Sequence, residues 1–183
     1  MLSIFVHSRT DWLYYFTGDP TLFESEEYLT RQNPSSTGVY VLNCLFKSIT
    51  SINVYGGALC CVSVRYLLVE SSSFFSCNTS SQNGGAIYFS NTNSGECVLY
   101  KVCGCDCCST YTSSTSHGQF TYVEVRNDAS NKNYFNYSSI TRCVNEIPNS
   151  NFISRFFNGK ICCPSVNISM NKCYYRSGIY CYP

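Results

Sequence analysis

The sequence predicts an all-β protein, and within that class a solenoid in which equivalent strands of successive repeats stack on one another. The main evidence is a repeated motif, Gly-Gly-Ala followed by an aliphatic residue, at residues 56–59 and again 28 residues later at residues 84–87. At the same offset Phe46 matches Phe74. A unit of this length cannot bury its apolar face alone, so it must stack on its own copies.

The composition also favours strands and excludes some partners. The chain of 183 residues is long enough for one domain with a continuous core. It includes 16 Tyr and 12 Phe, aromatic residues that favour strands. The formal net charge is only +1, which leaves no basic field to hold a nucleic acid, so no nucleic-acid partner is expected. No segment approaches the roughly 18 apolar residues of a membrane-spanning helix, so no transmembrane segment is predicted.

The strands of the first two coils are predicted from short apolar segments between polar turns, at residues 39–42, 58–62, 66–69, 74–77 and 86–89. Residues 97–100 align with residues 67–70 at an offset of 30 and begin a third coil. At that offset Cys107 falls on Cys77, so the core of this coil continues the core of the second.

Two more degenerate coils follow, with their cores at residues 139–143 and 166–170. The Asn-rich stretches at residues 127–136 and 145–151 are predicted to be loops that leave the stack, because Asn favours turns over strands. The solenoid would then have about four or five coils.

The N-terminal segment, residues 1–36, differs from the rest. It holds an aromatic run at residues 12–16, a turn at residues 18–20 and a predicted short helix at residues 24–29. We expect this segment to cap the end of the solenoid, because an open coil exposes unpaired edge groups that must be covered.

The double glycines are predicted to form a structural turn. The turn residues are Gly56, Gly57, Gly84 and Gly85. Residues without a β-carbon can adopt a positive φ at a sharp corner, and the small alanine that follows fits where the chain turns inward. Leu59 and Ile87 would then point into the core, one above the other, about 4.8 Å apart as adjacent strands require.

Fourteen cysteines are many for a chain of this size. In an oxidising compartment they would form disulfides, whereas in a reducing one they would be small apolar core residues. Neighbouring coils bring α-carbons to roughly the separation that a disulfide needs, so Cys77 and Cys107 are the pair predicted to form one.

The cluster at residues 103–108 is the main candidate for cysteine chemistry. Cys105 and Cys108 have the spacing of a zinc-binding pair, but a zinc site needs a second pair and none is evident, so no metal is predicted. In a strand, Cys103, Cys105 and Cys107 would share one face, which we expect to point into the coil or toward cysteines of neighbouring coils.

No catalytic or cofactor-binding residue is predicted. A nucleophilic cysteine needs a positioned histidine, and the chain has only His7 and His117. Polysaccharide-cleaving enzymes need grouped acids, whereas the eleven acids here are thinly spread and Asp106 stands alone in its coil. A carbohydrate-active enzyme therefore remains only the alternative function.

A resemblance adds to this interpretation. The FxxN spacing of Phe75 and Asn78, followed by GGAI at residues 84–87, is similar to the paired FxxN and GGA[ILV] motifs of polymorphic outer membrane protein repeats. The chain resembles the Cys- and Asn-rich protist proteins with these repeats over residues 37–125, although Thr50 replaces the Asn in the first coil. The resemblance implies a right-handed parallel β-helix, on the cell surface or secreted, with a role in adhesion and no catalytic residues to carry over.

The sequence therefore predicts an N-terminal cap segment (residues 1–36) and a right-handed parallel β-helix (residues 37–183). The expected function is non-enzymatic binding of a protein or glycan through a sheet face or loops; a fragment of a larger repeat protein without its own function is a further alternative. The tyrosines that could line one exposed face are Tyr88, Tyr100, Tyr122 and Tyr137. Cysteine content favours the cell surface or exterior, although residues 1–6 are too short an apolar stretch to predict a signal peptide.

Overall fold

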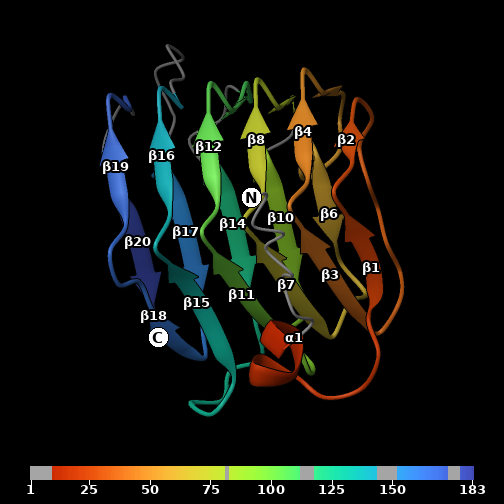
Figure 1. Ribbon diagram of the computed structural model, residues 1–183. Helices are drawn as coiled ribbons and strands as arrows, with labels where there is room; N and C mark the ends of the chain where they lie inside the picture. The colour runs from red at the N-terminus through yellow and green to blue at the C-terminus, as the bar shows by residue number, and fades with distance from the viewer. Residues whose placement is uncertain (1–9, 81–82, 112–117, 144–151, 173–177) are drawn as a thin grey trace, which may run out of the picture.

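The computed structural model describes residues 10–80, 83–111, 118–143, 152–172 and 178–183. Strands dominate these ranges and lie side by side in parallel sheets (Figure 1). The one helix among them, α1 (Thr10–Tyr15), has six residues, and the described ranges contain no helix with the length and apolar character needed to cross a membrane.

Four sheets account for the described strands. Sheet A contains, in spatial order, β1 (Thr21–Glu24), β3 (Gly38–Leu42), β7 (Tyr66–Glu70), β11 (Glu96–Tyr100), β15 (Lys132–Asn136) and β18 (Lys160–Cys162). Sheet B contains β2 (Glu27–Tyr28), β4 (Leu45–Lys47), β8 (Ser73–Phe75), β12 (Cys103–Cys105), β16 (Ser139–Thr141) and β19 (Asn167–Ser169). Sheet C contains β6 (Leu59–Cys61), β10 (Ile87–Ser90), β14 (Thr121–Glu124), β17 (Ser154–Phe157) and β20 (Ile179–Tyr182). The short sheet D contains β5 (Thr50–Ser51), β9 (Asn78–Thr79) and β13 (Cys108–Ser109).

The chain visits these sheets in a fixed order. It runs from sheet A to sheet B, then through the short sheet D where that is present, to sheet C and back to sheet A; we call each such round a pass. Every strand pairs in parallel with the strand of the same sheet in the neighbouring pass, as in the register of Val39 with Leu67 and of Leu67 with Cys97. The predicted all-β class with parallel strands is thus confirmed. Five passes have strands in sheets A, B and C, within the four or five coils that the repeat predicted, and they follow a first pass with strands in sheets A and B only.

The corners between sheets use the left-handed backbone conformation. The residue directly after each of the first five sheet A strands has a positive φ (Ser25, Asn43, Ser71, Lys101 and Tyr137), and Ser165 has one three residues after β18. One residue after five of the sheet B strands does so too: Ser48, Ser76, Asp106, Arg142 and Met170. Because non-glycine residues adopt this conformation only when their surroundings require it, the recurrence shows that the five passes after the first bend at the same two places.

The double-glycine motif forms a corner as predicted, but its two glycines have different roles. Gly56 and Gly84 have φ of +66° and +69°, whereas Gly57 and Gly85 do not have a positive φ. A β-carbon on Gly57 would clash with the carbonyl oxygen of Gly85 in the next pass. The first glycine therefore supplies the turn, and the second allows close approach of two backbones.

The core is a set of inward-facing columns that run along the stack. The rings of Phe46 and Phe74 stack with centroids 4.6 Å apart, as the repeat predicted. Leu59 and Ile87 lie in register and are both fully buried, also as predicted. In the next pass Gly104 occupies the column of the two phenylalanines, and the ring of Phe120 fills the space that its missing side chain leaves.

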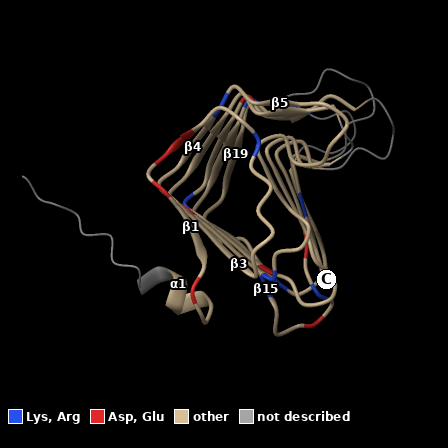
Figure 2. Ribbon diagram, turned by 90° about the vertical axis from the view of Figure 1, so that its right-hand side faces the viewer, with Lys and Arg blue, Asp and Glu red and all other residues tan. Residues whose placement is uncertain are grey.

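The N-terminal segment corrects two expectations. Residues 24–29 do not form a helix. The short strands β1 and β2 occupy residues 21–24 and 27–28 instead, and they pair with β3 and β4 of the predicted β-helix domain. The helix lies earlier and packs beside the stack, with Trp12 and Phe16 against the outer face of sheet A (Figure 2), so in this segment it is β1 and β2 that lie over the end of the stack. An apolar helix needs an apolar surface, which that face provides with residues such as Leu68 and Val98.

The expected loop at residues 127–136 is also wrong in its second half, because Lys132–Asn136 form β15. Asn133 is fully buried there, and its side-chain amide donates to the carbonyl oxygens of Phe157 at 2.9 Å and Asn158 at 3.0 Å. Such bonds let a turn-forming residue stand in a buried strand. The other expected loop, residues 145–151, lies outside the described residues.

Candidate functional site

The outer face of sheet C carries a continuous group of aromatic side chains. We call this group the aromatic surface; its members are Tyr55, Tyr88, Tyr122, Phe157, Tyr180 and Tyr182. Tyr88 and Tyr122 project outward because the buried residues of the same strands, Ile87 and Val123 among them, point inward. The period of two along each strand therefore places these rings on one face.

The rings of the aromatic surface stack on one another along the sheet. The centroids of Tyr55 and Tyr88 are 4.7 Å apart and those of Tyr88 and Tyr122 are 5.2 Å apart, with ring planes 15° and 13° from parallel. Tyr88 and Tyr122 are also direct neighbours in the parallel register of β10 and β14. Because the ring faces contact each other, ring edges and hydroxyl groups are what remains to meet a ligand.

Arg155 is held inside this aromatic surface. It lies in the same column as Tyr122 and Tyr180, and its guanidinium carbon is 4.0 Å from the ring centroid of Phe157 and 5.4 Å from that of Tyr180. Burial lowers its pKa, and its buried Nε has no hydrogen-bond partner within the described residues. Arg155 is therefore a partly desolvated cation positioned by cation–π contacts.

Glu124 supplies the acidic group of the same face. Its Oε2 accepts hydrogen bonds from the Ser90 hydroxyl and the Tyr122 hydroxyl, each at 3.2 Å. Burial and the nearby Glu124 carboxylate raise the pKa of Tyr122, so this phenol stays neutral and remains a hydrogen-bond donor at ordinary pH.

The structure only partly supports the predicted tyrosine face. Tyr88 and Tyr122 lie together, but Tyr100 lies in β11 of sheet A and Tyr137 at the corner after β15, with their rings 5.7 Å apart. The prediction of one face for all four is therefore wrong. Sequence reasoning missed Tyr180, whose outward position in the last described strand could be found only by extending the register across irregular repeats.

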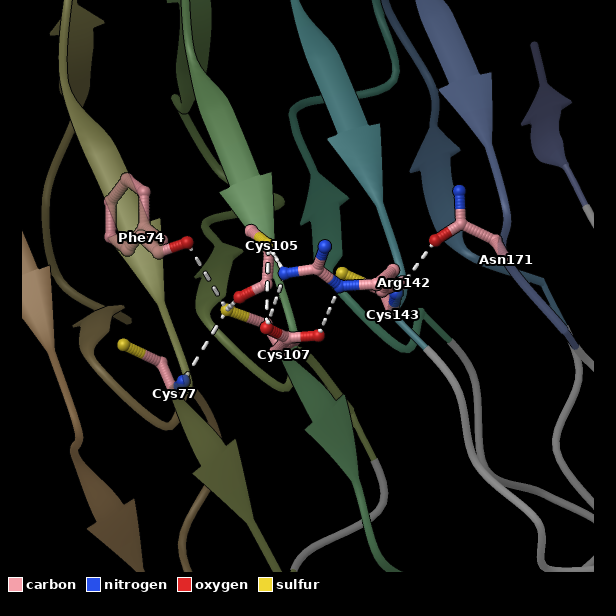
Figure 3. Close-up of polar contacts among 8 residues, drawn as sticks. Phe74, Cys77, Cys105, Cys107, Arg142, Cys143 and Asn171 are labelled. Atoms are coloured by element: carbon pink, nitrogen blue, oxygen red, sulfur yellow. Dashed lines mark hydrogen bonds and ion pairs between the residues drawn. The ribbon is translucent and has the colours of Figure 1, made fainter.

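The four predicted turn glycines lie at the corner that leads into sheet C, and the predicted cysteine pair lies in the core. Cys77 and Cys107 are buried neighbours: the backbone N–H of Cys77 donates to the Sγ of Cys107 at 3.4 Å (Figure 3). A hydrogen bond with Cys107 and burial raise the pKa of Cys77, and burial raises that of Cys107. All cysteines of the described ranges, these two included, are free thiols in this structure. A disulfide between Cys77 and Cys107 would need an oxidising compartment, and it stays a prediction.

The cluster at residues 103–108 does not share one face. Cys103 and Cys105 point outward from β12, whereas Cys107 points into the core, because Asp106 with a φ of 54° turns the chain between them. Arg142 binds the Asp106 carboxylate through two hydrogen bonds of 2.9 Å and donates to the Sγ of Cys105 at 2.9 Å (Figure 3). The Arg142 hydrogen bonds lower the pKa of Asp106.

This cluster is not a candidate metal site in the part of the chain that the structure describes. No group of three or more His, Cys, Asp or Glu side chains there is placed to hold a metal ion. Both histidines, His7 and His117, lie outside the described residues. The Arg142–Asp106 contact is a surface ion pair, of a kind that adds little to stability.

Comparisons with protein-family models, curated proteins and solved structures find no match to this chain. The class of the protein is therefore defined by its own features: an all-β protein of stacked parallel sheets that exposes a face of stacked tyrosines around an arginine.

Proposed function

We propose that the chain is a right-handed parallel β-helix of the polymorphic outer membrane protein repeat type. The fixed order of the sheets and the in-register parallel pairing of every pass support this fold. The motif residue Asn78 supports the repeat type, because its Oδ1 accepts the backbone N–H of Cys108 at 3.1 Å and so ties one pass to the next.

The proposed role of the protein is non-enzymatic binding, as an interaction or adhesion module on the cell surface or outside the cell. The observation that carries this proposal is the aromatic surface. Tyrosine and arginine dominate the energetic centres of binding surfaces, because each combines large contact area with directional hydrogen bonds. Arg155 and Tyr180 lie side by side on this face, and both are only half-buried.

The ligand expected on this face is a protein or a glycan with many hydrogen-bonding groups. Stacked rings offer edges and hydroxyls rather than open faces, so a ligand gains more from hydrogen bonds than from lying flat on a ring. Arg155 and Glu124 add one group of each charge, which gives the face polarity without a net field.

A binding assay tests this proposal. Purified protein would be applied to glycan arrays and to matrix and cell-surface proteins, beside a variant with Tyr180→Ala and Tyr182→Ala. We expect this variant to lose about tenfold or more of the affinity for whatever ligand the wild-type chain binds. The matched control is Phe75→Ala on the outer face of sheet B, where Phe75 is 39% exposed, and it should bind like wild type.

Equal binding by the wild type and the tyrosine variant, with unchanged circular dichroism, would remove the aromatic surface from the proposal. Turnover of a polysaccharide by the purified protein would instead favour a carbohydrate-active enzyme. Detection of a tagged chain in its own cell without permeabilisation tests the proposed location, and a signal only after permeabilisation would contradict it.

A further inference from the structure

The two ends of the stack present strand edges that lack a neighbour within the described residues. At one end lies the first pass, with β1 and β2 at the edges of sheets A and B. At the other end lies the last pass, with β18, β19 and β20 at the edges of sheets A, B and C. Edge strands of this kind are templates for pairing with another chain.

Both ends also expose apolar side chains that would be core residues inside the stack. Ile168 of the last pass is half-buried, whereas its neighbour in the same column, Ile140, is fully buried. Phe23 and Tyr28 of the first pass are likewise half-buried, and Tyr28 stacks on Phe46 with centroids 4.9 Å apart. Each end therefore has apolar area to bury.

The charges of the two ends are opposite. The first pass carries four exposed acidic side chains and one partly exposed Arg31; the acids are Asp19, Glu24, Glu26 and Glu27. Figure 2 shows acidic residues at the corner near β1 and β4. The described part of the last pass, residues 158–172 and 178–183, holds the exposed Lys160 and Lys172 and no Asp or Glu.

We propose that copies of this chain stack head to tail, the last pass of one copy resting on the first pass of the next. The inward columns of sheets A and B continue through such a contact without a change of register. In sheet B, the column runs through Tyr28, Phe46, Phe74, Gly104, Ile140 and Ile168. The next copy would place its Tyr28 over Ile168, apolar on apolar.

The same register brings opposite charges together in sheet A. Continuing the column of Lys132 and Lys160 places Lys160 beside Pro20 of the next copy, one residue from Asp19. Within the chain, Lys132 already makes this kind of contact between passes, with Glu96 at 3.0 Å. Pairing of two like ends would set lysines against lysines or acids against acids, so the charges select the head-to-tail arrangement.

A head-to-tail contact between copies is heterologous and does not close, because each added copy leaves a free end. Sedimentation velocity of the full chain over a wide dilution series tests this directly. We expect a mass that grows with concentration beyond a dimer, and association that weakens as salt is added. A single monomer mass at every concentration would overturn the proposal.

Variants with one altered end make the test sharper. A tail variant would carry Lys160→Glu and Lys172→Glu, and a head variant would carry Glu24→Lys and Glu27→Lys. Each variant alone should associate about tenfold or more weakly than wild type. Mixed together they should co-assemble beyond dimers, because the intact tail meets the intact head and the reversed tail meets the reversed head.

Reversal of all four charges in one chain should restore assembly, since its two ends are again complementary. The matched control is Lys47→Glu with Lys101→Glu, exposed lysines of middle passes, which should assemble like wild type. Control variants that dissociate as strongly as the end variants, or a mixture that stays monomeric while wild type assembles, would contradict stacking through these ends. Circular dichroism of each variant confirms that the fold is retained.

Discussion

The outer faces of sheets A and C are built alike but end in different surroundings. On sheet A the outward column includes Tyr40, Leu68 and Val98, which are at most 2% exposed because α1 lies over them. On sheet C the outward column includes Tyr88, Arg155 and Tyr180, which remain half-buried, while the neighbouring Tyr182 is 54% exposed.

The difference follows from side-chain chemistry. Leucine and valine side chains on a sheet face raise the free energy of the folded protein when they stay in contact with water. Sheet A therefore needs a cover, and Trp12 and Phe16 supply it. Tyrosines stacked through their ring faces keep edges and hydroxyls that water or a ligand can satisfy. The aliphatic residues on sheet A therefore explain why that face is covered, and the stacked tyrosines on sheet C explain why that face can stay in contact with water.

The largest expected effect comes from the core that both faces share. Ile87→Asp would bury an unpaired charge in the inward column, at a cost of several kcal/mol, which is a large part of a domain's stability of about 5–15 kcal/mol. We expect loss of the cooperative unfolding transition in chemical denaturation. Thr92→Asp, at an exposed turn of the same pass, is the control and should unfold like wild type.

The second effect concerns the cover of sheet A. Trp12 is 3% exposed, and its Nε1 donates to the carbonyl oxygen of Gly18 at 2.7 Å. Trp12→Ala should lower the free energy of unfolding by about 3–5 kcal/mol and increase binding of a hydrophobic dye, because the face beneath becomes exposed. Leu13→Ala, at a residue 69% exposed, should change stability by less than about 0.5 kcal/mol. Equal effects of the two changes would contradict the cover.

A smaller effect is expected on sheet C. Tyr88→Ala removes a half-buried ring that stacks between Tyr55 and Tyr122. Denaturant unfolding should show a loss of about 1–2 kcal/mol, less than for Trp12, because no face is uncovered. A loss as large as that of Trp12→Ala would mean that sheet C depends on its surface rings as much as sheet A depends on α1.

The smallest expected effect is on thiol reactivity and not on stability, and it concerns one cysteine of sheet C and one of sheet A. A hydrogen bond with Cys163 lowers the pKa of Cys181 in β20 to about 7, whereas burial raises the pKa of Cys97 in β11. Because the thiolate is the reactive form, alkylation of Cys181 should rise as pH increases through about 7, while Cys97 should react only after unfolding. Site-resolved mass spectrometry measures both rates.

The control for this titration is Cys163→Ala. Without its partner, the pKa of Cys181 should move up toward the ordinary value of a cysteine, about 8.5, and the rise in alkylation should move with it. An unchanged profile would show that Cys163 does not set the reactivity of Cys181.

Much of the inner structure could be predicted from the sequence. The columns of Phe46 with Phe74 and of Leu59 with Ile87 follow from one offset, because identical spacing places like side chains over one another. The offset of 30 that aligned Cys107 with Cys77 is also confirmed by the register of β7 and β11. These are local patterns of period two, repeated at offsets of 28 and 30 residues.

The corners were harder to predict. Left-handed residues such as Lys101 and Arg142 give no local signal, because these residue types rarely adopt a positive φ. The turn at Asp106 redirected the cysteine cluster, so Cys103 and Cys107 face opposite ways although alternation alone placed them together. Asn133 likewise gave a loop signal and forms a buried strand, because carbonyl oxygens at the end of β17, in the same pass but about 24 residues further along the chain, accept hydrogen bonds from its side-chain NH2 group.

The sequence by itself determined the strand class, the repeat and the identity of the inward columns, because each of these depends on side chains a few residues apart or one repeat apart. Only the tertiary structure decided which aromatic face α1 covers, which tyrosines meet around Arg155, and which charges gather at each end of the stack. Those outcomes depend on contacts between segments that lie far apart in the sequence and are not related by the repeat. The free energy of these contacts is set by how much surface each of them removes from water.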